Sequence, residues 1–419
     1  MVRATSEIPL AAGAGATLAD RTALLPIAGA ARPRSGTEIA AALLAIVLAL
    51  VAIGLVMVYS TTAVEAERSG DPTRYVRRQA LFALLAGGAL AIAWHTDYRK
   101  VLAARTHLLV ATLVLLVLVL FAQPVNGARR WFDLGANHLQ PSEIAKVALV
   151  VFLAGSCAEK EALKTFRSTA KICATLASLL VLIAVEPDFG TAAFLGVLAF
   201  AVLFVAGVRL AYAAAVGIPV AGAVALYAAT HFEHVRNRIQ VFLEPAADPL
   251  GKGYQIHQAL IALGSGGFGG LGLGRSRQKL FFLPDDHTDF VLAILGEELG
   301  LVGTALVAAL FAAFVAYGMR IAFRARDRGG FLLAFGLTAT VGLQAAMNIA
   351  VVTASFPTKG ISLPFISFGG SSLLVAMTSV GILLSIARKS AETPEASARQ
   401  IGRDRAPRAQ LDSEEVRDA

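Results

Sequence analysis

Charged residues are scarce in this sequence: Asp, Glu, Lys and Arg make up 16% of its 419 residues, while 56% are hydrophobic. Soluble domains carry about a quarter charged residues, because their surfaces face water. The composition therefore excludes a soluble globular protein and indicates that most of the surface faces lipid. A membrane-spanning helix needs about 20 mostly apolar residues. On this basis we predict an all-α, polytopic membrane protein with about ten transmembrane helices.

Cysteine is also rare, with only Cys157 and Cys173 in the whole chain. Structural disulfides are therefore not expected, and both residues are predicted to be free thiols. No cluster of metal-ligating residues is visible, so no cofactor is predicted, although a divalent cation such as Mg²⁺ or Mn²⁺ stays open. The net charge of +8 is scattered through short loops, as expected for residues that fix topology and contact anionic lipid. Nucleic-acid binding is not expected.

The two ends of the chain differ in composition from the middle. Residues 1–36 are rich in Ala, Gly, Thr and Arg, lack the apolar core of a signal peptide, and are predicted to be a disordered tail. Residues 389–419 are charged, lack aromatic residues, and are predicted to be a second disordered tail. Residues 37–388 form the predicted transmembrane domain. Most basic residues collect on the side that both tails share, so both termini are predicted to be cytoplasmic and the long loop 231–288 external.

This external loop contains two different segments. Residues 253–263 have helical periodicity and are followed by a glycine-rich run over residues 264–274. No strand precedes the glycines, so a dinucleotide-binding fold is excluded. The run is either a flexible loop whose N–H groups approach a phosphate or a mobile linker.

The loop ends in a cluster of acids. The segment LPDDHTDF (residues 283–290) runs directly into an apolar helical stretch. Acids at membrane depth are costly and usually persist for a function, so the segment predicts a membrane enzyme or transporter. Glu297 and Glu298 lie about 12 Å deeper than Asp289. They are too far away to share its proton, and we predict that they are buried structural acids.

One predicted span contains charges of both signs. Glu143 and Lys146 are three residues apart, so they can meet on one helix face. An unpaired charge there would cost several kcal/mol, which favours an ion pair, either mutual or with another helix. The pair is predicted to be structural, with a place in the wall of a substrate cavity as the alternative.

Four segments of the sequence form an ordered set of motifs. The first is NGARRW (residues 126–131), continuing to QPSEIAK (140–146), and the second is EPDFGT (186–191). The third runs from residue 253 through LPDDHTDF to ILGEELGLVG (294–303), and the fourth is FPTKGISLPFISFGGSS (356–372). Together they resemble the SEDS family (shape, elongation, division and sporulation), the FtsW/RodA-type peptidoglycan polymerases. The resemblance covers residues 40–390 and implies the SEDS fold.

Two short motifs within these segments favour one branch of the family. PTKG (residues 357–360) and QKL (278–280) resemble the division branch (FtsW) more than the elongation branch (RodA). Two departures are visible. Glu186 stands where the family more often has Gln, and Asp285 and Asp286 replace a more usual Glu-x pair before the histidine.

The resemblance implies a glycosyltransferase that polymerises lipid II, a disaccharide-pentapeptide carried on a polyprenyl diphosphate. Asp289 is then the predicted general base on the acceptor 4-hydroxyl, because partial desolvation raises the pKa of a carboxyl toward useful basicity. The polyprenyl diphosphate leaves, and an α-linked donor becomes a β-1,4 product by inversion. In the alternative interpretation, Thr288 or Asp289 only caps the first turn of a helix. Asp285 and Asp286 are expected to be solvated.

Other residues are predicted to bind the substrate. A diphosphate leaving group needs cationic stabilisation, although each cation could instead contact lipid headgroups. His287 either orients the substrate or Asp289, or makes a local hydrogen bond. Asp188 either joins the site or shapes a turn. The predicted cations are Arg129, Arg130, Lys279 and Lys359.

The resemblance also implies partners and a location. The expected partners are lipid II, membrane lipid, a class B penicillin-binding transpeptidase (FtsI-like) and other divisome proteins. The expected location is the bacterial cytoplasmic (inner) membrane at the division septum, with the active site on the external, periplasmic face. Three alternatives stay open: an elongation-type (RodA-like) polymerase, a non-catalytic scaffold, and a lipid II flippase that uses Glu143, Lys146 and Glu297.

Overall fold

The structure, a computed structural model, describes most of the chain between Gly36 and Glu392. The described residues are 36–68, 70–71, 73–124, 128–133, 138–159, 163, 165–244, 248, 251, 253–284, 286–358 and 360–392, without the side chains of residues 64–68 and 234. The predicted tails fall almost entirely outside this set. The last helix ends at Ala391, two residues beyond the predicted start of the C-terminal tail at residue 389.

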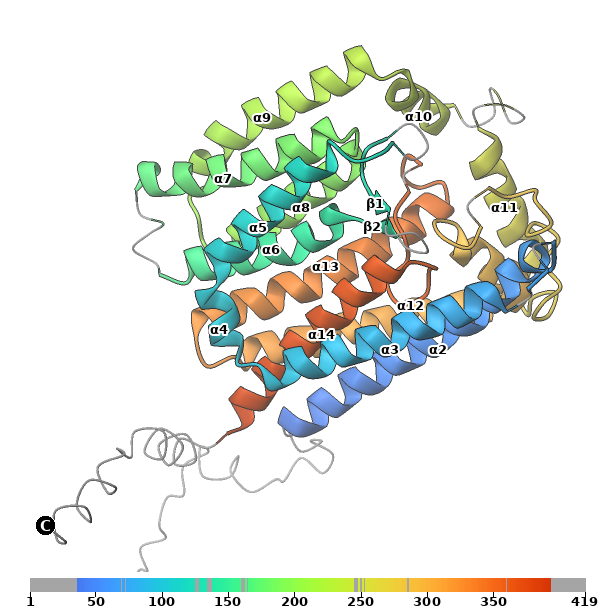
Figure 1. Cartoon of the computed structure of the whole chain (residues 1–419), viewed down its shortest axis with the longest axis horizontal. Helices are drawn as coiled ribbons and strands as arrows, with labels where there is room; N and C mark the ends of the chain where they lie inside the picture. The colour runs from blue at the N-terminus through green and yellow to red at the C-terminus, as the bar shows by residue number, and fades with distance from the viewer. Residues whose placement is uncertain are drawn as a thin grey trace, which may run out of the picture. The chain divides into compact units, whose positions relative to one another are not determined.

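The described residues are mainly helical, with one short β-hairpin (Figure 1). The hairpin pairs β1 (Phe132–Asp133) with β2 (His138–Leu139) in antiparallel register. The helices are α2 (Gly36–Arg68), α3 (Arg74–His95), α4 (Tyr98–Ala103), α5 (Arg105–Val119), α6 (Pro141–Cys157), α7 (Phe166–Val185), α8 (Phe189–Val205), α9 (Leu210–His231), α10 (Glu233–Leu243), α11 (Tyr254–Gly266), α12 (Val291–Phe323), α13 (Arg328–Val352) and α14 (Gly370–Ala391).

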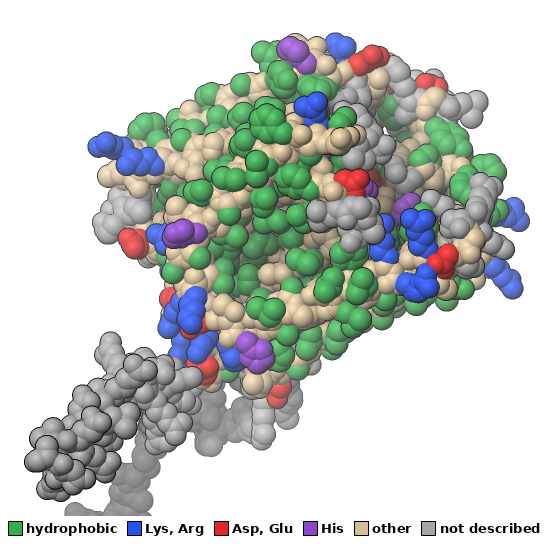
Figure 2. Space-filling view, in the orientation of Figure 1, with side chains coloured by type: hydrophobic (Ala, Val, Ile, Leu, Met, Phe, Trp, Pro, Cys, Tyr) green, Lys and Arg blue, Asp and Glu red, His purple; other side chains and the backbone are tan. Residues whose placement is uncertain are grey.

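Ten of these helices correspond to the ten predicted spans. Within the described residues, seven are long and apolar enough to cross a membrane: α2, α3, α7, α9, α12, α13 and α14. The helices α5 and α8 are apolar but shorter, and α6 contains the two charges predicted within a span. Large apolar side chains such as Leu84, Ile92 and Phe121 are more than two-thirds exposed. Figure 2 shows hydrophobic side chains covering the flank of the helices, as a lipid-facing surface requires. The predicted fold class is confirmed.

The described chain begins and ends at the same end of the helix bundle. A Cβ atom on Gly36, at the start of α2, would lie 3.0 Å from the Cβ atom of Ala391 at the end of α14. The helix α4 lies at this end, whereas the β-hairpin, α10 and α11 lie at the opposite end (Figure 1). The loop that joins α11 to α12 therefore enters the bundle from the end opposite the termini.

The helix α12 is broken at Gly300, whose φ of 67° and ψ of −161° are not helical. At the break, the carbonyl oxygens of Glu297 and Glu298 accept hydrogen bonds from the amides of Leu271 (2.9 Å) and Gly272 (3.0 Å). A Cβ atom on Gly270 would collide with the backbone at the break, so the close approach depends on glycine. The glycine-rich run is therefore packed against α12, so the prediction of a mobile linker is wrong, and the phosphate loop stays a prediction.

The first segment of α12, before the break, contains two buried acids whose charges are compensated. Glu298 accepts a hydrogen bond from the Lys279 ammonium at 2.9 Å, and Ser60 donates to the same carboxylate at 2.7 Å. Glu297 accepts hydrogen bonds from the Ser276 hydroxyl and from the Arg277 amide. Both acids are at most 1% exposed, which confirms the prediction that they are buried. Their partners hold the loop after the glycine-rich run against α12.

The predicted pair on α6 is also present. The Lys146 ammonium lies 2.7 Å from the Glu143 carboxylate and 2.9 Å from the side-chain oxygen of Gln344 on α13. Both side chains of the pair are at most 13% exposed. The ammonium therefore joins α6 to α13, in addition to neutralising Glu143.

We expect Lys146→Met to destabilise the protein by about 3–5 kcal/mol, because it leaves the Glu143 carboxylate without its cation. The double variant Glu143→Gln/Lys146→Met should lose less, since it removes both charges. Thermal unfolding of the purified variants in detergent measures both effects. A double variant less stable than Lys146→Met alone would contradict this account of the pair.

Candidate functional site

Asp289 lies immediately before α12, at the end of the bundle opposite the termini. The N-cap residue of α12 is Phe290, whose side chain makes no capping hydrogen bond. A capping role for Thr288 or Asp289 stays the alternative prediction. A Cβ atom on Gly360 would lie 2.6 Å from the Asp289 Oδ2 atom. The carboxylate thus occupies space that only glycine leaves open in the loop after α13.

Two amides on α13 hold the loops around this carboxylate. Asn348, which is 1% exposed, donates through Nδ2 to the backbone oxygens of Asp289 (2.8 Å) and Ile361 (2.6 Å). Gln344, one turn earlier, donates to the backbone oxygen of Ser362 at 2.9 Å. The same Gln344 side chain accepts from the α6 ammonium described above. A continuous set of contacts therefore joins the buried ion pair to the loop that faces Asp289.

Arg130 binds the hairpin between α7 and α8. Its Nε atom donates to the backbone oxygen of Glu186 at 2.9 Å, and its Nη2 atom donates to that of Pro187 at 2.5 Å. The guanidinium also lies 5.9 Å from the Trp131 ring. The guanidinium is therefore anchored by backbone carbonyl groups of the hairpin.

Asp188 caps α8 from the same hairpin. Its carboxylate accepts a hydrogen bond from the Thr191 amide at 3.1 Å and from the Gln140 side chain at 3.4 Å. The residue is 8% exposed. The predicted turn-shaping role of Asp188 is therefore present in the structure, and its place beside Arg130 keeps the substrate role open as a prediction.

Arg238 on α10 lies near Arg130, Asp188 and Asp289, and these four residues are called the charged cluster. Sequence reasoning missed Arg238. Burial lowers the pKa of Arg238 from its usual value, and Arg130 lowers it further, whereas Asp289 and Asp188 raise it. These four charges therefore lie within electrostatic reach of one another. The side chain is nevertheless exposed to solvent. The sequence of α10, EHVRNRIQVFL, carries two arginines but no pattern that tells which of its faces meets the site.

Glu186 is the second residue that sequence reasoning did not place in the site. It follows the end of α7 and is fully buried, and neither of its carboxyl oxygens has a hydrogen-bond partner. Burial raises the pKa of Glu186 to about 8; the charge of Asp188 adds to this and Arg130 opposes it. The carboxyl is therefore mainly protonated at neutral pH.

Three other predicted residues make separate contacts. His287 bonds through Nδ1 to the adjacent Asp286 at 3.0 Å, and its ring packs against Tyr75 and Phe368. Lys279 is buried in the ion pair with Glu298, and Arg129 donates to the Leu120 backbone oxygen at the end of α5. For Lys279 and Arg129 the geometry favours structural roles.

Lys359 and Asp285 lie outside the described residues. Among the residues that the structure does describe, no three His, Cys, Asp or Glu side chains gather as metal ligands.

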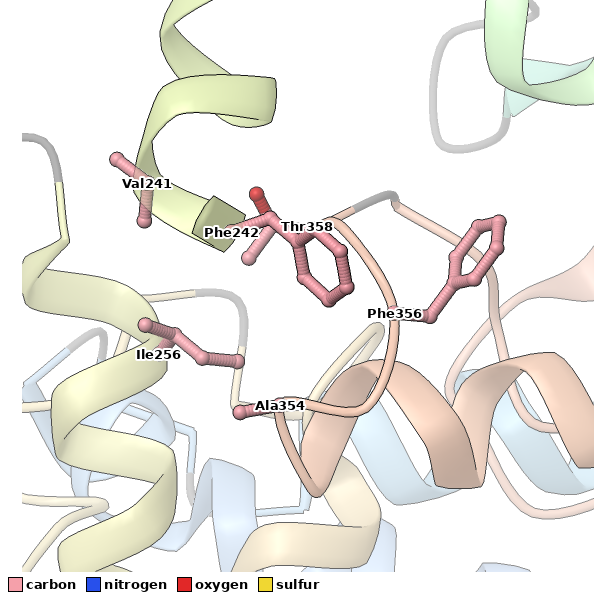
Figure 3. Close-up of a pocket in the computed structure, with 6 residues that line it drawn as sticks. All are labelled: Val241, Phe242, Ile256, Ala354, Phe356 and Thr358. Atoms are coloured by element: carbon pink, nitrogen blue, oxygen red, sulfur yellow. The ribbon is translucent and has the colours of Figure 1, made fainter. Parts of the chain in front are cut away.

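Figure 3 shows a small apolar pocket. Its walls come from the end of α10, the start of α11 and the loop after α13, the loop that also contains Gly360. The lining residues are Val241, Phe242, Ile256, Ala354, Phe356 and Thr358. The site therefore combines two cations, two carboxylates and a neighbouring apolar surface, as an amphiphilic anionic ligand would require.

The sequence model of the FtsW/RodA/SpoVE family, described as "Cell cycle protein", matches residues 40–392. The chain belongs to the SEDS family. A probable peptidoglycan glycosyltransferase FtsW from Geobacter metallireducens is 41% identical over 359 residues, covering 84% of this chain and 95% of that protein. Stage V sporulation protein E of Bacillus subtilis is 40% identical over 355 residues, covering 83% of this chain and 96% of that protein.

Solved structures of SEDS proteins share the fold. A chain of a peptidoglycan synthase complex that coordinates polymerization and crosslinking is similar with a TM-score of 0.66 and 26% identity, covering 84% of this chain and 98% of that chain. The rod shape determining protein RodA of Thermus thermophilus is similar with a TM-score of 0.63 and 25% identity, covering 84% and 97% of the two chains. The predicted SEDS resemblance is confirmed, and the protein is a multi-pass membrane protein.

We expect Gly360→Ala to lower glycosyltransferase activity about 100-fold, because the added methyl group displaces the Asp289 carboxylate and a shift of about 1 Å can cost that much. The matched control is Gly264→Ala, where nothing lies within 4 Å of the new Cβ atom. Rates of glycan synthesis and melting temperatures of both variants should be measured together. Equal activity of Gly360→Ala and Gly264→Ala would exclude this close contact as a constraint on the carboxylate.

Proposed function

We propose that this protein polymerises lipid II into glycan strands during cell division, with Asp289 as the general base. The enzyme class, peptidoglycan glycosyltransferase, is the one that the FtsW relatives share at about 40% identity over most of the chain. The same relatives favour division over elongation. The observation that carries the residue assignment is the close packing of Asp289 against Gly360, within electrostatic reach of Arg238.

The proposed reaction is a direct displacement. Asp289 accepts the proton of the acceptor 4-hydroxyl, and that oxygen attacks the anomeric carbon of the donor sugar. The bond from this carbon to the diphosphate oxygen breaks, so the α-linked donor gives a β-1,4 product. The contacts of Asn348 and Gly360 support this role, because Asn348 holds the Asp289 backbone and Gly360 leaves space for the carboxylate.

The leaving group in this proposal is the polyprenyl diphosphate, whose negative charge increases as the bond breaks. Arg130 and Arg238 supply positive charge where it is needed, and carbonyl groups hold Arg130 in place. The adjacent apolar pocket suits the hydrocarbon next to the diphosphate. Binding of lipid II itself is part of this proposal.

The location and the partners are also proposed. Basic residues are more numerous at the end of the bundle that contains both termini, so that end is assigned to the cytoplasm and the Asp289 end to the external face at the septum. The structural neighbour belongs to a complex that couples polymerization to crosslinking. A class B penicillin-binding transpeptidase is therefore the proposed partner, together with other divisome proteins.

A flippase is less well supported. Such a transporter would depend on charges along a path through the membrane. Lys146, Glu143 and Glu297 are instead engaged in buried contacts with neighbouring protein groups. The external position proposed for Asp289 suits chemistry on a substrate that has already crossed the membrane.

The decisive variant is Asp289→Asn, which keeps the shape of the side chain but removes its basicity. We expect polymerisation of labelled lipid II to fall by about 10²–10⁴-fold, the usual contribution of a general base. The assay uses the purified protein with its transpeptidase partner.

The matched control is Asp133→Asn, because Asp133 lies on the β-hairpin with a side chain that is 56% exposed. Both variants should keep the wild-type melting temperature. Full-length glycan strands made by Asp289→Asn at the wild-type rate would refute the assignment of the general base.

A further inference from the structure

The Glu186 carboxyl is an unusual group for a protein interior. It is 0% exposed, and neither oxygen has a hydrogen-bond partner. Every other buried acid described above has a partner: Glu297 binds amides and a hydroxyl, and Glu298 binds an ammonium. An ionised carboxylate left without partners would cost several kcal/mol, so the group is expected to stay neutral at neutral pH. Its raised pKa, to about 8, agrees with this expectation.

The groups that face this carboxyl come from two elements. Asp188, on the same hairpin, disfavours its ionisation, and Arg130, from the loop between α5 and β1, favours it. Arg238 of α10 and Asp289 before α12 lie farther along the same cluster. With Glu186 neutral, the two arginines balance the two aspartates, and ionisation of Glu186 would add one negative charge beside Arg130.

This added charge would act on the cation that binds the hairpin backbone. Arg130 donates to the backbone oxygens of Glu186 and Pro187, so the guanidinium is held next to the residue whose charge changes. A carboxylate at this position would attract the guanidinium and reduce its pull on an external anion. This competition is strong because the Glu186 carboxyl is fully buried and charges interact more strongly at low dielectric.

We propose that Glu186 is a positioning residue whose bound proton leaves the Arg130 guanidinium free to hold the diphosphate of the ligand. Deprotonation above neutral pH then weakens diphosphate binding while the fold is kept. This inference rests on the proposed function, since it takes a prenyl diphosphate as the ligand. It adds a specific residue and a pH dependence to that function.

The first test measures binding of farnesyl diphosphate to the full chain in detergent, with farnesol as the uncharged probe. A carboxyl that titrates near 8 is about nine-tenths protonated at pH 7 and about one-tenth at pH 9. The affinity of the wild type should therefore fall about tenfold over this interval. In Glu186→Gln, a neutral side chain of the same shape, the fall should be less than about twofold. An equal fall in the two proteins would overturn the proposal, as would a fall of the same size with farnesol.

A second measurement does not depend on binding. The infrared difference spectrum between the wild type and Glu186→Gln should contain the stretching band of a protonated carboxylic acid at pH 7, and the band should be lost by pH 9. Absence of the band at pH 7 would overturn the proposal.

The two proposals fail in different ways. Loss of the general-base assignment leaves the infrared band and the diphosphate titration unchanged. A normal polymerisation rate with a pH-independent diphosphate affinity would instead refute only the role of Glu186.

Discussion

The structure depends on one constraint: a charge inside an apolar helix bundle must be neutralised by a partner. Lys146 satisfies it with Glu143 and Gln344, and Lys279 satisfies it with Glu298. In each case the partners come from different parts of the chain, so neutralisation also fixes how the helices pack. A buried pair is weak support for net stability, because desolvation offsets the Coulomb attraction, but it specifies which elements meet. The first pair thereby orients α13, whose Gln344 and Asn348 hold the loop around Asp289.

The same constraint applies to backbone groups. A helix broken inside a membrane protein releases N–H and C=O groups that need new partners. At the break in α12 the glycine-rich run supplies them, and Leu271 and Gly272 donate to carbonyls that the helix no longer uses. The segment of α12 before the break is therefore a rigid, buried element, and Asp289 stands directly before it. A catalytic group at the start of a rigid element is held more firmly than one in the middle of a loop.

Hydrophobic runs predicted the ten spans, because the length and apolarity of a membrane helix are set by the bilayer and are local properties of the sequence. The Glu143–Lys146 contact was also predictable, since residues three apart meet on a helix face. Asp289 was chosen from its motif.

Sequence reasoning placed Lys279 in the site, but its ammonium turns inward to Glu298, a partner in the following helix. It missed Arg238 because no local pattern tells which face of α10 looks toward residues far away in the chain. The glycine-rich run was misinterpreted for the same reason, since its partners lie at a break in α12 that the sequence did not reveal.

Glu186 departs from the rule that a buried charged group has a partner, and it lies within the cluster that includes Asp289. A sequence under selection only for stability would replace an unpartnered, fully buried carboxyl with an apolar side chain of similar size, because nothing compensates the cost of burying it. Sites that break a rule followed elsewhere in the same fold are often functional. Here the unpartnered group lies beside Arg130 and Asp188, and its proton determines the net charge of the cluster. In the proposed mechanism, the arrangement that holds Asp289 and the arrangement that leaves Glu186 unpartnered serve one reaction. The first would fix where a proton is removed, and the second would keep a positive charge available for the anion that leaves.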